Sequence, residues 1–391
     1  MLIGRKFTVL GGGIGGLAAA TALAQRGAQV TVLEQADAIR EVGAGMQISP
    51  NGAAVLRGLG LGPMLEDMGV RARAVRLVDF RKSSKVLELD LSKTDGAYYF
   101  VHRADLHNLL ATAAREAGVK LRLLQKITNV ELCGEEGVRV TSAQGAERKA
   151  QFLIGADGLH SVLRDVVNGP STPEFTGQVA WRATVPVDES REPVVTVHMG
   201  PGRHIVSYPL RGGKAMNFVA VEERDIWAEE SWSHTDDPEN LRAAFAGFAP
   251  DIRALLDRVE SVHLWGLFRH PVAETWFKGN AALIGDAAHP TLPFLAQGAN
   301  MALEDAWALT SALANNDDTQ QALAAYQAVR RKRCEKIVDA ASKNARNYHL
   351  SFPPLRFAAH TALRVGGALA PSVMLGKFDW LYGYDVTQTC P

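Results

Sequence analysis

The sequence predicts an α/β protein with a parallel sheet built from separated stretches of the chain, a second, mixed or antiparallel sheet, and C-terminal helices. A β-rich segment, a glycine cluster, a helical segment and a second β-rich segment follow one another over residues 7–33, as in a βαβ unit. Alternating apolar and polar residues from Val179 to Val221 indicate antiparallel strands. A buried-strand pattern returns at Ala281 to Gly285, so the second sheet interrupts the first.

Hydrophobic periodicity predicts the strands and helices around the parallel sheet. Phe7 to Leu10 predicts the first strand, and Leu17 to Gln25 predicts a helix. This helix should end before Gly27, because glycine readily adopts the left-handed conformation that closes helices. The later predicted elements are a strand at 29–33, a helix at 105–117, strands at 119–123, 138–141 and 150–155, and a helix from about 297 to 314.

The changes of pattern divide the chain into three regions. The predicted limits are 1–70, 100–178 and 270–325 for a discontinuous domain built on the parallel sheet, 71–99 and 179–269 for a second domain, and 326–391 for a C-terminal helical segment. Glu304, Asp305 and the basic run from Arg330 to Lys336 lie in helical context. We interpret them as solvated helix faces.

Composition indicates an ordinary globular protein. The chain has 391 residues, more than one hydrophobic core usually supports, and 47% of them are apolar. Lys plus Arg and Asp plus Glu number 42 each, which argues against nucleic acid or an anionic membrane as a partner. The apolar segment from Thr361 to Phe378 is interrupted by Arg364, Pro371 and Lys377, so no membrane span is predicted.

Cysteine usage points to a reducing compartment. Cys133, Cys334 and Cys390 are far apart and odd in number, without a C-x-x-C pair, so neither a disulfide framework nor a metal site is predicted. The first apolar stretch runs into the glycine cluster without a cleavage site, which is typical of a strand and not of a signal peptide. We therefore expect a cytoplasmic protein, as a monomer or a homodimer.

The glycine cluster fits the dinucleotide-binding pattern G-x-G-x-x-G. Its glycines, followed by an acid that ends the next strand 18 residues after the last of them, are Gly11, Gly13, Gly15, Gly16 and then Glu34. Such glycines let the backbone approach a pyrophosphate at a helix N-terminus, and the acid can hold ribose hydroxyls. The motif alone does not separate FAD from NAD. A carboxylate at Glu34 would repel a 2′-phosphate, which argues against NADP at this site.

Two later segments carry a resemblance to a known family. Residues 285–290 read G-D-A-A-H-P and continue through Pro293 and Gln297 into a helix, and residues 155–164 read G-A-D-G-L-H-S-V-L-R. The first resembles the G-D-A-x-H-P motif of class A flavoprotein aromatic hydroxylases, and the second resembles their D-G motif. With the glycine cluster, these motifs stand in the family's order over residues 7 to about 310. The resemblance implies bound FAD. It makes the discontinuous domain at 1–70, 100–178 and 270–325 a Rossmann-like FAD-binding domain, and the second domain, at 71–99 and 179–269, a substrate domain.

The resemblance assigns further cofactor contacts. It implies that Asp286 binds the ribityl hydroxyls of FAD and that Asp157 contacts FAD and NAD(P)H; without it, Asp286 could equally cap a turn. The other implied contacts with the cofactor, including the backbone that shapes the oxygen site, are Arg103 in an H-R-x-x-L segment, Gln47 in G-A-G-M-Q-I at 43–48, Pro293, Gly298, Ala299 and Asn300. His289, followed by Pro290 in a tight turn, is interpreted as structural.

The substrate site is predicted on one strand. His204, Val206 and Tyr208 share a face, and the ends of this set lie about 13 Å apart by strand rise, suited to flanking an aromatic ring. This H-x-x-x-Y pattern resembles that of 3-hydroxybenzoate 6-hydroxylases and 6-hydroxynicotinate 3-monooxygenases, and Gln297 resembles a pocket glutamine of these enzymes. A strand histidine is otherwise more often a satisfied core residue. The second group of enzymes carries histidine where Gln47 stands, which counts against hydroxynicotinate.

The resemblance implies an FAD-dependent monooxygenase of aromatic catabolism that hydroxylates a small phenolic acid such as salicylate or 3-hydroxybenzoate. NADH or NADPH would visit transiently to reduce FAD, O₂ would add at C4a of the flavin, and His204 would deprotonate the phenol while Tyr208 and Gln297 orient the ring. A second G-x-G-x-x-G is absent, which disfavours enzymes with two dinucleotide domains. The halogenase signature W-x-W-x-I-P is missing around Trp181.

Three alternatives remain open on the sequence. The protein could be a flavin monooxygenase or epoxidase that acts on a larger natural product, or an FAD-bound sensor without turnover. A third alternative, an NAD-dependent dehydrogenase that uses the N-terminal motif alone, leaves the two later segments, around Asp157 and Asp286, unexplained.

Overall fold

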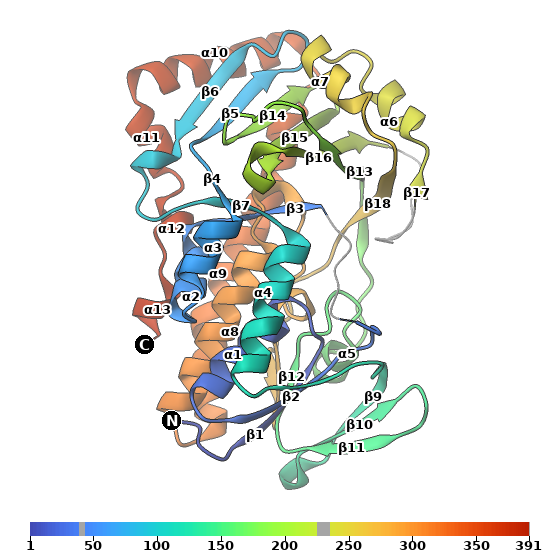
Figure 1. The fold of residues 1–391 in the computed structure, drawn as a ribbon, viewed down its shortest axis with the longest axis vertical. Helices are drawn as coiled ribbons and strands as arrows, with labels where there is room; N and C mark the ends of the chain where they lie inside the picture. Colours follow the sequence, from blue (N-terminus) through green and yellow to red (C-terminus); the bar gives the residue numbers. More distant parts are fainter. Residues whose placement is uncertain (39–43, 225–234, 391) are drawn as a thin grey trace.

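The computed structural model describes residues 1–38, 44–224 and 235–390. It has two layers, each built on a large sheet, and long helices that run between them (Figure 1). The lower layer holds both the N-terminus and the glycine cluster. Gly43, part of the segment predicted to lie beside the flavin, falls outside the described residues.

The lower layer is built on a sheet whose described strands lie in the order β19-β20-β12-β1-β2-β8. All neighbours are parallel except the antiparallel pair β19 and β20. The bounds are β1 (Lys6–Leu10), β2 (Gln29–Leu33), β8 (Lys120–Arg122), β12 (Leu153–Gly155), β19 (Phe277–Lys278) and β20 (Ala281–Leu283). This order brings β12 and β20, distant in sequence, beside β1, as the interrupted pattern predicts.

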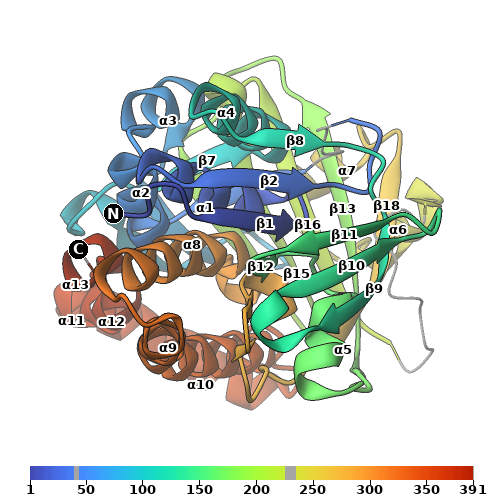
Figure 2. The same ribbon diagram turned by 90° about the horizontal axis from the view of Figure 1, so that it is seen from below.

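Helices and a small sheet flank this parallel sheet. Helix α1 (Ile14–Gln25) packs against β1, β2, α4 (Arg103–Glu116) and α8 (Gly298–Asn315). The small antiparallel sheet joins β9 (Ile127–Leu132), β10 (Val138–Ser142) and β11 (Glu147–Ala150), and α5 (Val162–Asn168) lies against it (Figure 2). Two helices start earlier than predicted. Helix α1 begins at Ile14 and so includes Gly15 and Gly16, and α4 begins at Arg103. The predicted strand at 150–155 is split, and only Leu153–Gly155 joins the parallel sheet.

The upper layer is a mixed sheet whose described strands lie in the order β17-β18-β13-β16-β15-β14-β5-β6. Its ladder is antiparallel apart from the pair β14 and β5. Helices α6 (Pro238–Ala244) and α7 (Pro250–Leu256) cover its outer face through Leu241, Phe245 and Ile252. The bounds are β5 (Ala74–Asp79), β6 (Lys85–Asp90), β13 (Glu174–Pro186), β14 (Val194–Gly200), β15 (Arg203–Leu210), β16 (Ala215–Glu223), β17 (Thr235–Asp236) and β18 (Val262–Arg269).

A second small sheet lies between the layers (Figure 1). It has the order β3-β7-β4, and helices α2 and α3, which pack on α8 and α4, connect β3 to β4 along the chain. The bounds are β3 (Gly45–Ile48), β4 (Val70–Arg71), β7 (Tyr99–His102), α2 (Pro50–Gly58) and α3 (Gly62–Met68). Strand β7 contacts β15 of the upper sheet, which ties the two layers together.

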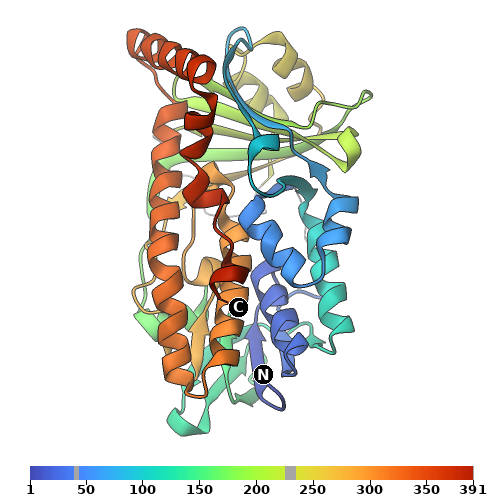
Figure 3. The ribbon, with the colours of Figure 1, turned by 90° about the vertical axis from the view of Figure 1, so that its left-hand side faces the viewer.

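The C-terminal helices span the whole molecule. Helix α9 (Thr319–Tyr348) rises from α8 to the upper sheet, α10 (Pro353–Leu369) lies over β6, and the last turns descend again toward α2 (Figure 3). These last helices are α11 (Pro371–Gly376), α12 (Asp379–Tyr382) and α13 (Val386–Thr389). Within the described ranges, no helix is both long enough and apolar enough to cross a membrane.

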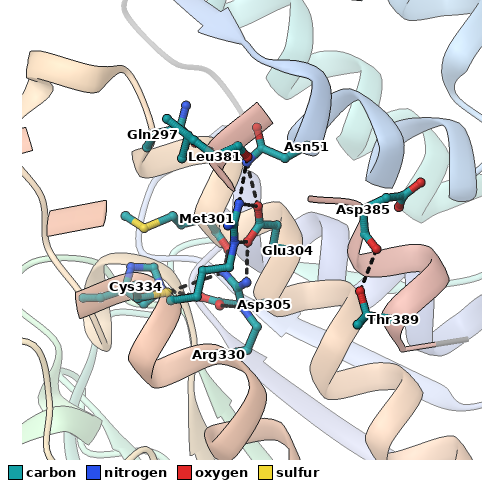
Figure 4. A network of polar contacts seen from close by, with 12 residues as sticks. Asn51, Gln297, Met301, Glu304, Asp305, Arg330, Cys334, Leu381, Asp385 and Thr389 are labelled. Carbon is teal, nitrogen blue, oxygen red and sulfur yellow. Dashed lines mark hydrogen bonds and ion pairs between the residues drawn. The ribbon is translucent and has the colours of Figure 1, made fainter. Parts of the chain in front are cut away.

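The interface between α8 and α9 corrects one prediction. Glu304, Asp305 and Arg330 are fully buried, although we interpreted them as solvated faces. Arg330 donates to both carboxylates, with Nε 2.8 Å from Oδ1 of Asp305 (Figure 4). Arg333 donates from Nε to Glu304 Oε2 at 2.9 Å. The prediction was wrong because periodicity does not show that two charged helix faces pack against each other and neutralise their charges.

Candidate active site

A cavity of about 1110 Å³ lies between the two layers. Its walls include the glycine cluster and Asp286 from the lower layer, and His204 and Tyr208 from the upper sheet. Sites for one small molecule usually measure about 300–1,000 Å³. This cavity therefore has room for a dinucleotide and a small second ligand together.

The glycine-rich turn forms one end of the cavity. Gly11 has a φ of +104°, and a Cβ there would collide with the carbonyl oxygen of Ala156. Gly13 differs, because a Cβ there would meet no protein atom within 4 Å and the residue lines the cavity. Gly13 is also the N-cap of α1 and provides no side-chain cap. The turn is thus an open cradle at a helix N-terminus, which suits a pyrophosphate.

Glu34 and a histidine hold this turn. The Glu34 carboxylate accepts hydrogen bonds from the amides of Gly12 (2.7 Å) and Ala36 (2.8 Å). Nε2 of His107, on α4, lies 2.7 Å from the carbonyl oxygen of Gly12. Sequence reasoning missed His107, and its position one helical turn after Arg103 was the only available signal. Glu34 is not among the residues that line the cavity, so its predicted contact with ribose hydroxyls stays a prediction.

The other end of the cofactor region is formed by Asp286 and the start of α8. Asp286 is accessible from the cavity, and a Cβ at Gly298 would lie 3.9 Å from its Oδ1. Burial in the protein raises the pKa of Asp286, while His289 and Arg103 act in the opposite direction. Burial lowers the pKa of Arg103, and Asp286 opposes this shift. A carboxylate, a guanidinium and a helix N-terminus therefore meet at one place.

The N-terminus of α8 opens on the cavity. Gly298 and Ala299 line it, and the first backbone bond of the helix runs from the amide of Met301 to the carbonyl of Gln297 at 2.8 Å. The amides of residues 298–300 precede that bond, so they have no partner within the helix. Pro293 lines the same wall. The open glycine cradle, Asp286 and these amides fit a flavin dinucleotide, with positive potential available for a reduced, anionic ring.

Two predicted cofactor contacts have their side chains engaged elsewhere. Asp157 accepts hydrogen bonds from the hydroxyl of Ser161 (2.6 Å) and the amide of Val162 (2.9 Å), and so caps α5. Its neighbours Gly158 and Leu159 line the cavity instead. Asn300 is buried and donates from Nδ2 to the carbonyl of Gln47 at 3.0 Å, which clamps β3 to α8.

Gln297 lies in the same kind of internal network. It lines the cavity, yet its Nε2 donates to Ser49 Oγ (3.0 Å) and its Oε1 accepts from Asn51 Nδ2 (3.1 Å). Asn51 Nδ2 also donates to Glu304 at 2.6 Å, so the chain of bonds leads into the ion pairs of α8 and α9. The side-chain amide of Gln297 is thus bonded within the protein through both its oxygen and its nitrogen. Gln47 lines the cavity and accepts from the Tyr98 hydroxyl at 2.7 Å.

The upper sheet supplies the remaining wall. His204, Val206 and Tyr208 all line the cavity, which confirms that they share one face of β15. His204 is buried, and its ring centroid lies 5.6 Å from that of Phe294 and 5.2 Å from that of Tyr348. Burial, followed by the charge of a neighbouring histidine, lowers the pKa of His204 well below its ordinary value. At neutral pH His204 is therefore an uncharged imidazole facing the cavity.

Residues 6–341 match the protein family described as FAD binding domain. The 3-amino-4-hydroxybenzoate 2-monooxygenase PtnB3 of Streptomyces platensis is 33% identical, over 97% of this chain and 96% of its own length. The 3-hydroxybenzoate 6-hydroxylase of Klebsiella oxytoca is 34% identical over 96% of both chains. This chain belongs to the FAD-dependent aromatic monooxygenases. The crystal structure of Klebsiella pneumoniae HpxO with FAD and uric acid has a TM-score of 0.84 at 28% identity, covering 96% of this chain and 97% of that one.

This monooxygenase has a further cation in its cavity that the sequence analysis did not identify. Arg182, on β13, stands in register with Val219 of β16, which is itself paired with Val206 of β15, and all three line the cavity. Its guanidinium lies 4.4 Å from the ring centroid of Trp265. Burial, followed by the charge of Arg103, lowers the pKa of Arg182 to about 10, so it stays charged at neutral pH. Only the pairing of distant strands brings it to the site.

His289 of the monooxygenase is structural, as the sequence indicated. It is fully buried, forms an ion pair with Asp305, and lies beside the buried Cys334. Arg330 Nη2 lies 3.5 Å from the sulfur of Cys334, so the group formed by His289, Asp305 and Cys334 already has a fixed positive charge beside it. The cluster belongs to the packing of α8 against α9.

Proposed function

We propose that this monooxygenase hydroxylates a small phenolic benzoate, with His204 as the base that removes the phenolic proton. The observation that carries the proposal is the position of His204, which faces the same cavity as Asp286 and the α8 N-terminus from the opposite wall. A neutral buried imidazole can accept a proton, and a phenolate is more electron-rich and more readily hydroxylated than a phenol.

The walls around His204 suit an aromatic acid. Val195, Val197, Val206, Val219 and Phe294 provide apolar surface for a ring. Arg182 and Arg103 place positive charge along the same cavity, which favours a carboxylate. Tyr208, buried and tilted against Phe100 at a centroid distance of 5.1 Å, would hold the ring or the carboxylate. The apolar walls also exclude water from the reacting atoms.

The remaining roles follow from the contacts. FAD, when bound, supplies the electrons from NADH or NADPH and the activation of O₂. The amides at the start of α8 would stabilise negative charge on the bound cofactor, and Asp286 would bind its hydroxyl groups. We infer that Gln297 positions α8 relative to β3 and Asn51, because the oxygen and the nitrogen of its side-chain amide are bonded to Asn51 and Ser49. The free thiols of Cys133, Cys334 and Cys390 suit a cytoplasmic enzyme, which we infer to be a monomer or a homodimer.

The test is an absorbance spectrum of the purified protein, followed by NADH and NADPH oxidation with 3-hydroxybenzoate, 3-amino-4-hydroxybenzoate, salicylate and 6-hydroxynicotinate. We expect bound flavin and an oxidation rate that one of the phenolic benzoates stimulates, with hydroxylated product formed in proportion. Flavin without stimulation by any of these acids would contradict the proposal and favour a larger substrate or a sensor.

A further inference from the structure

Three side chains connect the cavity wall to the protein surface. Nδ1 of His204 lies 2.6 Å from Nε2 of His349, and Nδ1 of His349 lies 2.8 Å from Oε1 of Glu223. His204 and His349 are buried, whereas half of the Glu223 side chain is exposed. The path therefore begins at a ligand-facing imidazole and ends at a carboxylate in contact with solvent.

The fold holds this path at the meeting point of three elements. His204 lies on β15, Glu223 is the last residue of β16, and His349 caps the C-terminus of α9. The amide of Gly202 donates to the carbonyl of His349 at 3.2 Å, and the amide of Glu223 donates to the carbonyl of Gly202 at 2.9 Å. The turn between β14 and β15 thus fixes the end of α9 to the end of β16 by backbone bonds.

The exposed carboxylate sets the direction of every hydrogen bond along the path. An ionised carboxylate only accepts, so Nδ1 of His349 donates to Glu223. The Nε2 of a neutral His349 then has no proton and accepts from Nδ1 of His204. Nε2 of a neutral His204 is consequently the unprotonated nitrogen, which is the form that a base requires.

Burial keeps both imidazoles neutral at rest, because it disfavours the charged form of each ring. Burial lowers the pKa of His349; Glu223 opposes this shift, and Arg203 adds to it. Arg203 is in turn paired with Glu222 at 3.3 Å, and Glu222 also binds Arg224 at 2.8 Å. The groups packed on His204 from α9 and the segment before α8 are the rings of Tyr348 and Phe294.

We propose that His204, His349 and Glu223 form a proton relay that carries the substrate's phenolic proton out of the closed cavity. The phenolic O–H bond breaks as Nε2 of His204 gains the proton, Nδ1 of His204 passes its proton to Nε2 of His349, and Nδ1 of His349 passes its proton to Glu223. One proton enters the path and one leaves to solvent, with no change of oxidation state. This inference rests on the proposed phenol hydroxylation, and His349 and Glu223 act in it as positioning residues.

The first test compares variants of the FAD-bound enzyme on the substrate identified above. Glu223→Gln and His349→Gln should lower kcat about tenfold or more, leave KM within about twofold, and increase the solvent isotope effect, because proton removal becomes slower. Glu223→Asp should restore part of kcat. Glu131→Gln, which removes a carboxylate of similar exposure on β9 in the other layer, should stay within about twofold of wild type. Wild-type kcat and isotope effect in both Glu223→Gln and His349→Gln would overturn the relay.

The second test needs no substrate. Nitrogen-15 NMR of histidine-labelled holoenzyme, assigned with His204→Gln and His349→Gln, should show an unprotonated Nε2 and a protonated Nδ1 on His204. Glu223→Gln should change the protonation pattern of His349, because an amide can donate as well as accept. A proton on Nε2 of His204 in the wild type would overturn the relay. Failure of every phenolic acid to be hydroxylated would contradict the proposed function instead and would leave the NMR result standing.

Discussion

His204 is the residue on which the chemistry depends most directly. Replacing it with glutamine keeps a polar side chain of similar size but removes the base. We expect His204→Gln to lower coupled hydroxylation about 10²-fold or more while FAD content is unchanged, since general-base catalysis contributes about 10²–10⁴-fold. The measurement is product formed per NAD(P)H oxidised at saturating substrate.

The matched control for this variant is His198→Gln. His198 is also a buried histidine, it stands on the adjacent strand β14 opposite Ile205, and burial lowers its pKa to about 4. It is not among the residues that line the cavity. His198→Gln should therefore retain wild-type coupling. Equal losses in the two variants would show that a histidine is needed for stability and not as a base.

The lowered pKa of His204 gives a prediction with a definite sign. Burial and the charge of His349 disfavour the protonated ring, so the neutral base persists as pH falls below the ordinary histidine value. We expect kcat/KM to stay level through pH 6.5 and to decline only at lower pH, where His204 finally gains a proton. A profile measured with a substrate that does not titrate in this range decides it. An acid limb centred at or above 6.5 would contradict the assignment.

Gly13 allows flavin binding to be separated from folding. A Cβ there would meet no protein atom within 4 Å, and φ is −74°, so Gly13→Val should fold normally. It should nevertheless weaken FAD binding at least about tenfold, because the valine occupies the space into which the pyrophosphate fits. The readout is flavin content after dialysis, with thermal unfolding as the measure of folding. Gly247→Val, at a glycine that is equally open but does not line the cavity, should keep its flavin.

The residues that could be predicted from the sequence have roles set by their immediate neighbours in the chain. The residues that were missed have roles set by partners distant in the sequence. Gly11 could be identified because its positive φ favours glycine whatever surrounds it, and Gly13 because the spacing G-x-G-x-x-G marks where a backbone approaches a pyrophosphate. The hydrogen bonds that engage Asp157 and Gln297 could not be predicted, because they depend on where a side chain points among several partners. Arg182 reaches the cavity only through the register of β13 with β16. Charge and spacing along the chain carry no information about such a register.

At the scale of elements, the packing of α8 against α9 depends on a buried ion network. Removing one partner of such a pair leaves an uncompensated charge, which costs about 3–5 kcal/mol. We expect Arg330→Met to lower the free energy of unfolding by about this amount, measured by denaturant titration of holoenzyme. Arg331→Met is the control, because Arg331 pairs with Glu335 at the surface and should contribute at most about 1 kcal/mol. A loss in Arg330→Met no larger than in Arg331→Met would contradict the buried network.

The same network has a pH dependence. Although burial disfavours the ionised form, His289 and Arg330 hold the pKa of Asp305 at about 2. This stabilisation is present above the ordinary carboxyl pKa and is lost as pH falls toward 2. Wild type should therefore lose its stability advantage over Asp305→Asn between about pH 4 and pH 2. A difference in the free energy of unfolding that stays constant over that interval would refute the assignment.

The elements themselves were predicted unevenly. The βαβ unit was correct because β1, α1 and β2 are adjacent in sequence and have clear periodicities. The burial of Glu304 and Arg330 was missed because a charged helix face gives the same pattern whether water or another helix covers it. The split between β11 and β12 was missed for a similar reason, since Phe152 continues the apolar run but belongs to neither strand.

At the scale of the whole molecule, the cavity joins the layers. Its lining runs from Gly13 in the lower layer to Tyr208 in the upper sheet and Tyr382 in α12, so a dinucleotide in it stabilises parts of the chain that are far apart. FAD at a concentration a hundredfold above its Kd raises the free energy of unfolding by about 2.7 kcal/mol, which corresponds to about 3 °C in Tm for a chain of this length. The release of flavin fluorescence and the loss of β-sheet circular dichroism should share one midpoint, and that midpoint should rise as FAD is added. Flavin release well below the sheet transition would mean that FAD is held by the lower layer alone and that the upper sheet, with His204, moves independently of it.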